Sequence, residues 1–155
     1  PGLRVSTDMP IPTPNELKKA LLNQGFEVYR TLGDRILLAE RVRENLIMDS
    51  GVSAVAAPEL GVRLVVRAQA YEFPGESDDE LFARARRLAS ASVDRGYVEV
   101  ETTVVTIRDP GDHTRTLDVW YEIAYQRTVA DLSQLFEELR YAVGVEKTAT
   151  TGALG

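Results

Sequence analysis

The chain has 155 residues, with 18 Lys and Arg against 24 Asp and Glu, a formal net charge of −6, one His and no Cys. The absence of Cys excludes disulfides, thiolate catalysis and zinc fingers, and a single His excludes a metal site built from several His ligands. The acidic net charge argues against nucleic-acid binding. No apolar run approaches the roughly 20 residues of a membrane-spanning helix, and residues 1–14 lack the order of a signal peptide, so we expect a cytoplasmic protein without membrane insertion.

The N-terminal part predicts an extended segment followed by a capped helix. Residues 1–12 are rich in proline and carry no hydrophobic period, so we expect them to be extended. Thr13 and Glu16 form a capping box around Pro14, which favours a helix that begins there. Gly25 supplies its C-terminal stop.

Strand patterns fill the next part of the chain. Two-residue alternation from Phe26 predicts a hairpin that turns at Gly33 and Asp34. Residues 41–58 suit a strand, our preferred interpretation, although Val42, Leu46 and Ile47 also fit a helical face. Residues 61–73 alternate as a strand with one solvated face.

A second capping box, formed by Ser77 and Glu80, begins a second helix over residues 77–94. The β-branched residues 97–108 and the alternating residues 117–125 then predict a second hairpin.

A third helix follows Thr128 and ends before Gly144. The sequence therefore predicts a single α+β domain at residues 13–144, in the order α-β-β-β(-β)-α-β-β-α, and a flexible tail at 145–155. Three helices and a mostly antiparallel sheet of five to six strands are expected. The predicted core comprises Leu21, Phe26, Leu64, Val66, Leu81, Leu88, Val104, Ile123, Leu135 and Leu139.

The turn that contains the only imidazole is one candidate for chemistry. His113 follows Asp109 and Asp112, which could orient it for acid–base work or hold a hard cation. Turns also collect Asp, Pro and Gly for backbone reasons, and the spacing of a calcium loop is missing. We therefore interpret this turn as a solvated hairpin tip and expect no metal and no cofactor.

Four acidic residues of the second hairpin are another candidate. Glu99 and Glu101 are expected to share one strand face, and Asp118 and Glu122 share a face of the return strand, so the four could form a carboxylate cluster. Such a cluster would suit a small-molecule-binding or carboxylate-based enzyme on a ferredoxin-like or steroid-isomerase-like scaffold. The preferred interpretation is a solvated face, offset by Arg108 or Arg115, and no catalytic residue is assigned.

The partner-binding candidates centre on Trp120, which lies on the polar face of its predicted strand and needs cover. A terminal segment, a second copy of the chain, a client peptide or neighbouring arginine stems could supply it. We expect a homodimer with Phe82, Val93 or Trp120 near the centre of the interface and Arg84 and Arg87 at its rim.

The order of these elements also resembles a known family. The predicted elements are a capped helix, a hairpin that begins at residues 25–28, a long strand at 61–70, a capped helix at 77–94, a strand pair and a last helix after Thr128. This order is similar to the type III secretion chaperone-like fold, including its YbjN-like bacterial relatives. The resemblance implies an acidic bacterial homodimer that binds extended segments of a protein or peptide client and has no enzymatic activity. Residues 41–58 are longer than that pattern requires.

Overall fold

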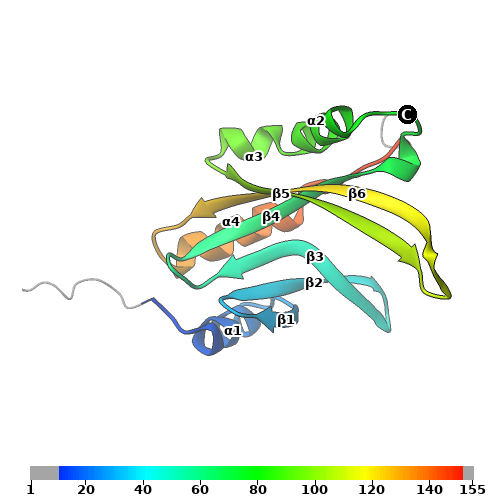
Figure 1. The fold of residues 1–155 in the computed structure, drawn as a ribbon. Coiled ribbons are helices and arrows are strands. Elements are labelled where there is room, and N and C mark those ends of the chain that lie inside the picture. Colours follow the sequence, from blue (N-terminus) through cyan, green and yellow to red (C-terminus); the bar gives the residue numbers. More distant parts are fainter. Residues whose placement is uncertain (1–10, 152–155) are drawn as a thin grey trace, which may run out of the picture. The chain divides into compact units, whose positions relative to one another are not determined.

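The computed structural model describes residues 11–151, in which four α-helices, one short 3₁₀ helix and seven strands occur (Figure 1). The α+β class is thus confirmed, with one helix and at least one strand more than predicted. Three strand pairs, β1–β2, β2–β3 and β5–β6, are antiparallel, and the β4–β7 pair is parallel. The chain divides into two compact units. The first comprises the chain up to Val62 together with Thr128–Leu139, and the second comprises Arg63–Arg127 together with the residues from Arg140 onward.

The first unit begins with α1 (Pro14–Asn23), where the predicted capping box of Thr13 and Glu16 is present. Leu17 and Leu21 are its buried residues. Three strands follow, β1 (Val28–Leu32), β2 (Arg35–Arg43) and β3 (Leu46–Val55), in an antiparallel meander. Strand is therefore confirmed for the second half of β2 and for β3, where a helical face was the alternative.

Helix α4 (Leu132–Val143) contributes its first eight residues to this unit. Phe136 of α4 lies beside Phe26, with ring centroids 6.2 Å apart, and Leu135 and Leu139 are fully buried. The chain reaches the helix through Val129, whose N–H donates to the carbonyl oxygen of Leu60 at 2.9 Å.

The second unit contains most of β4 (Gly61–Gln69), the 3₁₀ helix η2 (Ala70–Glu72), α2 (Asp78–Leu88), α3 (Ser90–Asp94), β5 (Val98–Asp109), β6 (Asp112–Thr128) and β7 (Thr148–Ala149). Its strand order is β4-β6-β5, so β5 is an edge strand. Figure 1 shows α2 and α3 along one face of β5 and β6. Phe82 of α2 packs edge-on against Tyr121 of β6, with centroids 5.2 Å apart.

Two predictions for this unit differ from the structure. The helix expected over residues 77–94 is broken at Ala89, whose φ of −95° and ψ of 4° end α2, and α3 is a separate short helix. Ser92 of α3 is buried and its hydroxyl lies 2.8 Å from the Tyr141 hydroxyl, an anchor that the periodic pattern does not reveal. The segment expected to be a tail holds β7, where the N–H of Arg67 donates to the carbonyl of Lys147 at 2.8 Å.

Most of the predicted core is buried. The exceptions are Phe26 and Leu88, which are half-buried, and Val104, which is 51% exposed. The prediction for Val104 is wrong because the residue lies on the edge strand β5, whose outer side has no neighbouring strand in the described chain. The fully or largely buried members are Leu21, Leu64, Val66, Leu81, Ile123, Leu135 and Leu139.

Candidate functional site

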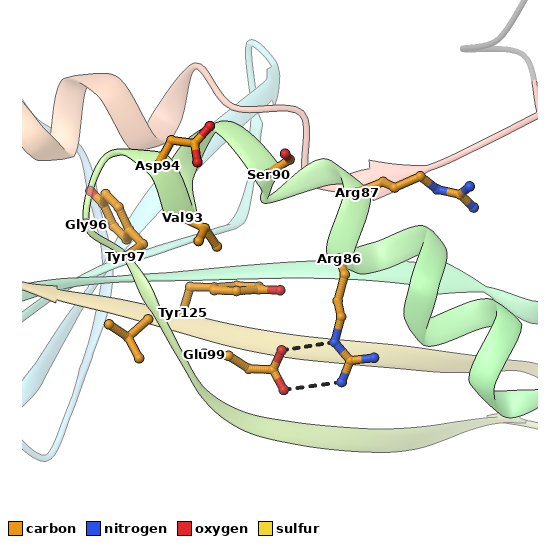
Figure 2. Close-up of a pocket in the computed structure, with 10 residues that line it drawn as sticks. Arg86, Arg87, Ser90, Val93, Asp94, Gly96, Tyr97, Glu99 and Tyr125 are labelled. Atoms are coloured by element: carbon orange, nitrogen blue, oxygen red, sulfur yellow. Dashed lines mark hydrogen bonds and ion pairs between the residues drawn. The ribbon is translucent and has the colours of Figure 1, made fainter.

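An open groove of about 700 Å³ lies in the second unit, between the α2–α3 corner and the start of β5 (Figure 2). Its apolar lining comes from Val93, Tyr97, Val98 and Tyr125. Val93 is 48% exposed and points toward the Tyr125 ring, whereas the Tyr97 side chain is almost fully buried and forms part of the wall. The groove thus presents an apolar surface that solvent reaches.

One ion pair borders this groove. Arg86 of α2 donates from Nε and Nη2 to the two carboxylate oxygens of Glu99 on β5, at 3.0 and 3.2 Å. The bidentate hydrogen bonds from Arg86 lower the pKa of Glu99 and raise that of Arg86. Burial, together with the charge of Glu99, raises the pKa of Tyr125. Glu99 is therefore held ionised and Tyr125 protonated, so neither of them is prepared to exchange a proton near neutral pH.

The carboxylate cluster predicted for the β5–β6 hairpin does not form. A bulge shifts the register between Glu99, which pairs with Tyr125, and Glu101, which pairs with Ala124. Because one extra residue, Val100, is inserted, the two glutamates point to opposite faces of the sheet. The expectation that they share a face is wrong for this reason.

Each of these carboxylates has its own hydrogen-bond partners instead. Glu101 pairs with Arg63 at 2.5 Å and Glu122 with Arg67 at 2.8 Å, so β4 and α2 supply the offsetting arginines. The prediction that Arg108 or Arg115 would offset the cluster is wrong, since Arg115 approaches Asp109 and Arg108 donates to the carbonyl of His113. Asp118 accepts from Trp120 Nε1 at 3.0 Å and from the N–H of Tyr71 at 2.8 Å.

An arginine covers Trp120, and an arginine stem is one of the four kinds of cover expected from the sequence. The Arg67 guanidinium carbon lies 4.2 Å from the centroid of the indole ring, and the same guanidinium pairs with Glu122. Trp120 is half-buried and opposes Val105 of β5. Its strand neighbour Tyr121 meets α2, so Trp120 points to the sheet face opposite the helix.

The other predicted partner-binding residues lie on the helix side. Phe82 is half-buried against Tyr121, and Val93 lines the groove. Arg84 is held by Glu76 through two hydrogen bonds of 2.7 and 2.6 Å and stacks 3.9 Å from the Phe73 ring. Arg87 is exposed and points away from Tyr125 in Figure 2, and it makes no hydrogen bond or ion pair with any residue between 11 and 151.

These five residues thus do not form one surface. Phe82, Val93 and Arg87 belong to the helical side of the unit, and Trp120 belongs to the other face. Their role in partner binding stays a prediction.

The hairpin tip around the only imidazole is solvated. His113 is exposed, Asp109 accepts from the N–H of Gly111 at 2.8 Å, and Asp112 accepts from Thr114. The hydrogen bonds from Thr114 lower the pKa of Asp112. Among the described residues, no group of three or more His, Asp and Glu is arranged to hold a metal ion.

The sequence interpretation did not locate which apolar residues of β5 are exposed. Val98, Val100 and Val104 are 63%, 50% and 51% exposed on an edge strand. Residues 102–107 of the same strand are β-branched and uncharged, a pattern that predicts a strand without stating whether the strand is covered. Position in the sheet, which the sequence does not state, makes this run a surface.

Comparison with protein-family models, curated proteins and solved structures gives no match to this chain. Within residues 11–151, no helix has the length and apolar character needed to cross a membrane.

Proposed function

We propose that this chain is a non-catalytic protein-binding domain of the chaperone-like or adaptor kind, which acts as a homodimer in the bacterial cytoplasm and binds an extended segment of a protein or peptide client. The observation that carries the proposal is the groove at the α2–α3 corner, whose accessible lining is mostly apolar and which is bordered by the bidentate Arg86–Glu99 ion pair. Exposed apolar surface of this kind is typical of protein-interaction sites. The acidic charge, which does not suit a nucleic-acid partner, also supports it.

The alternative, a carboxylate-based or small-molecule enzyme, has less support. A catalytic acid–base pair needs two titratable groups with different pKa values, which their environments shift toward neutral pH. In the groove the pKa of Glu99 is lowered and that of Tyr125 is raised, each away from neutral pH. Glu122, on the other face of β6, is tied to Arg67.

Selection from a random peptide library tests client binding directly. The immobilised protein is panned against phage-displayed 12-residue peptides, and enriched peptides are resynthesised for titration against three purified proteins: wild type, Val93→Glu and Val143→Glu. Val93 lines the groove and Val143 does not, although the two valines have similar exposures of 48% and 44%.

We expect enriched peptides to bind wild type with a Kd of about micromolar order and to lose about tenfold or more on Val93→Glu. Val143→Glu should bind like wild type. The proposal fails if no sequence is enriched over the bare support, or if both variants bind the enriched peptides as tightly as wild type does.

A further inference from the structure

The geometry points to the outer edge of β5 as the dimer interface: we propose that β5 pairs with β5 of a second copy of this chain, antiparallel, across a two-fold axis at Val104. This inference rests on the homodimer of the proposed function and assigns its interface. The two β4-β6-β5 sheets would then join into one continuous sheet.

The central part of the β5 edge, residues 102–107, lacks the features that keep an edge strand unpaired. In the described chain, β6 is the only strand beside β5, so one row of its backbone N–H and C=O groups has no strand partner. Natural edges are usually protected by charged residues, proline or a bulge within the strand. Residues 102–107 contain no charge, no Pro and no Gly, and the bulge at Val100 lies outside this run.

A second copy suits this edge because a two-fold pair closes on itself. In an isologous contact both copies use the same surface, so both edges are consumed and no further strand can add. The pairing of β5 with β6 is regular from Glu101 to Ile107, with register shifts on either side. The midpoint of this seven-residue run is Val104, so a two-fold axis there uses the whole regular run.

The resulting pairs are compatible in side-chain character. Antiparallel pairing across the axis sets Val104 opposite Val104, Thr103 opposite Val105, Thr102 opposite Thr106 and Glu101 opposite Ile107. No pair places like charges opposite each other, which would be destabilising. A shift of the axis to Val105 would set Glu101 opposite Asp109.

Charge at the ends of the run also favours the antiparallel arrangement. The extra residue at Val100 brings Glu99 to the position opposite Arg108 of the second copy, on the face that Val104 shares. Arg108 makes no ion pair with any carboxylate between residues 11 and 151. Its guanidinium is thus available to the Glu99 of the second copy, which already binds Arg86.

The predicted partner-binding residues flank this junction without forming its centre. Val105, next to the axis, opposes Trp120 on one face, and Val104 opposes Tyr121, the contact of Phe82, on the other. The groove at Val93 and Tyr125 opens on the helix side, and Glu99 of its lining lies at the end of this junction.

Single-cysteine cross-linking tests the interface cleanly because the chain has no native Cys. We oxidise variants that each carry one Cys, and the covalent dimer is measured on a non-reducing gel. The substituted positions are Thr102, Thr103, Val104, Val105 and Thr106. Val143→Cys, which is off this edge and 44% exposed, and Trp120→Cys serve as comparisons. Sedimentation of the wild type measures the oligomeric state independently.

We expect a wild-type dimer, a maximum of cross-linking at Val104 and at least about fivefold less at Val143→Cys. Val104→Lys should sediment as a folded monomer, as judged by an unchanged circular dichroism spectrum, and Val143→Lys should remain a dimer. A wild-type monomer overturns both this inference and the proposed homodimer. A dimer that cross-links at Trp120→Cys but not along β5, or that survives Val104→Lys, overturns the β5 interface and leaves the proposed homodimer standing.

Discussion

Removal of the arginine that covers the only tryptophan gives a prediction with two independent readouts. Arg67→Ala deletes the guanidinium 4.2 Å from the Trp120 ring centroid and its 2.8 Å ion pair with Glu122. The side chains of Arg67 and Glu122 are 29% and 20% exposed, so solvent only partly screens the pair. The cation–π contact contributes about 0.5–1 kcal/mol and the ion pair about 0.2–1 kcal/mol, which predicts a loss of about 0.7–2 kcal/mol in the free energy of unfolding.

Urea unfolding followed by tryptophan fluorescence measures both effects. Because water reaches the uncovered indole, the folded-state emission maximum of Arg67→Ala should move to longer wavelength. Arg63→Ala is the matched control, since Arg63 lies on the same face of β4 and pairs with Glu101. It should leave the emission maximum unchanged. An Arg67→Ala protein with wild-type emission and an unfolding free energy within about 0.3 kcal/mol of wild type would refute the assignment of Arg67 as the cover.

Two further predictions concern α4 and the groove. Leu135→Ala, at a fully buried position of α4, should lower the free energy of unfolding, measured in urea, by about 2–5 kcal/mol. Leu22→Ala, at a 50% exposed position, should lower it by less than about 1 kcal/mol, and equal losses would show that α4 is not packed. Hydrogen bonding to Arg86 lowers the pKa of Glu99 in the folded state, so its stabilisation is present above the unfolded pKa and is lost as pH falls through the folded pKa. The stability deficit of Glu99→Gln should therefore be largest near neutral pH and shrink below about pH 4, and a deficit independent of pH would contradict the ion pair.

Local signals carried the predictions that the structure confirms. The capping boxes at Thr13 with Glu16 and at Ser77 with Glu80 are both present, because each depends on four consecutive residues and on nothing distant in the chain. The turn at Gly33, which has a φ of +61°, is equally local. Helix starts and hairpin turns could thus be located from the sequence.

Features that depend on contacts between distant segments could not be predicted. The bulge at Val100 adds a single residue to a strand whose alternation looks continuous, and it separates Glu99 from Glu101. The parallel pairing of β7 with β4 joins residues 81 positions apart, and the small residues 148–149 carry no sequence pattern that predicts it. The prediction of the candidate site was the least accurate, because that bulge decides to which face of the sheet each β5 side chain points.

Pairing with arginines explains why the acidic residues of the β5–β6 hairpin form no carboxylate cluster. A negative net charge concentrated on one hairpin would leave carboxylates with raised pKa values, the starting point for acid–base catalysis. In the second unit three glutamates of the β5–β6 hairpin are instead each matched by an arginine from a different element, in the pairs Arg63–Glu101, Arg67–Glu122 and Arg86–Glu99, while Asp118 accepts from Trp120 and the N–H of Tyr71. With these carboxylates paired, the apolar groove and the uncharged edge of β5 are the exposed surfaces on which the proposed client site and dimer interface are based.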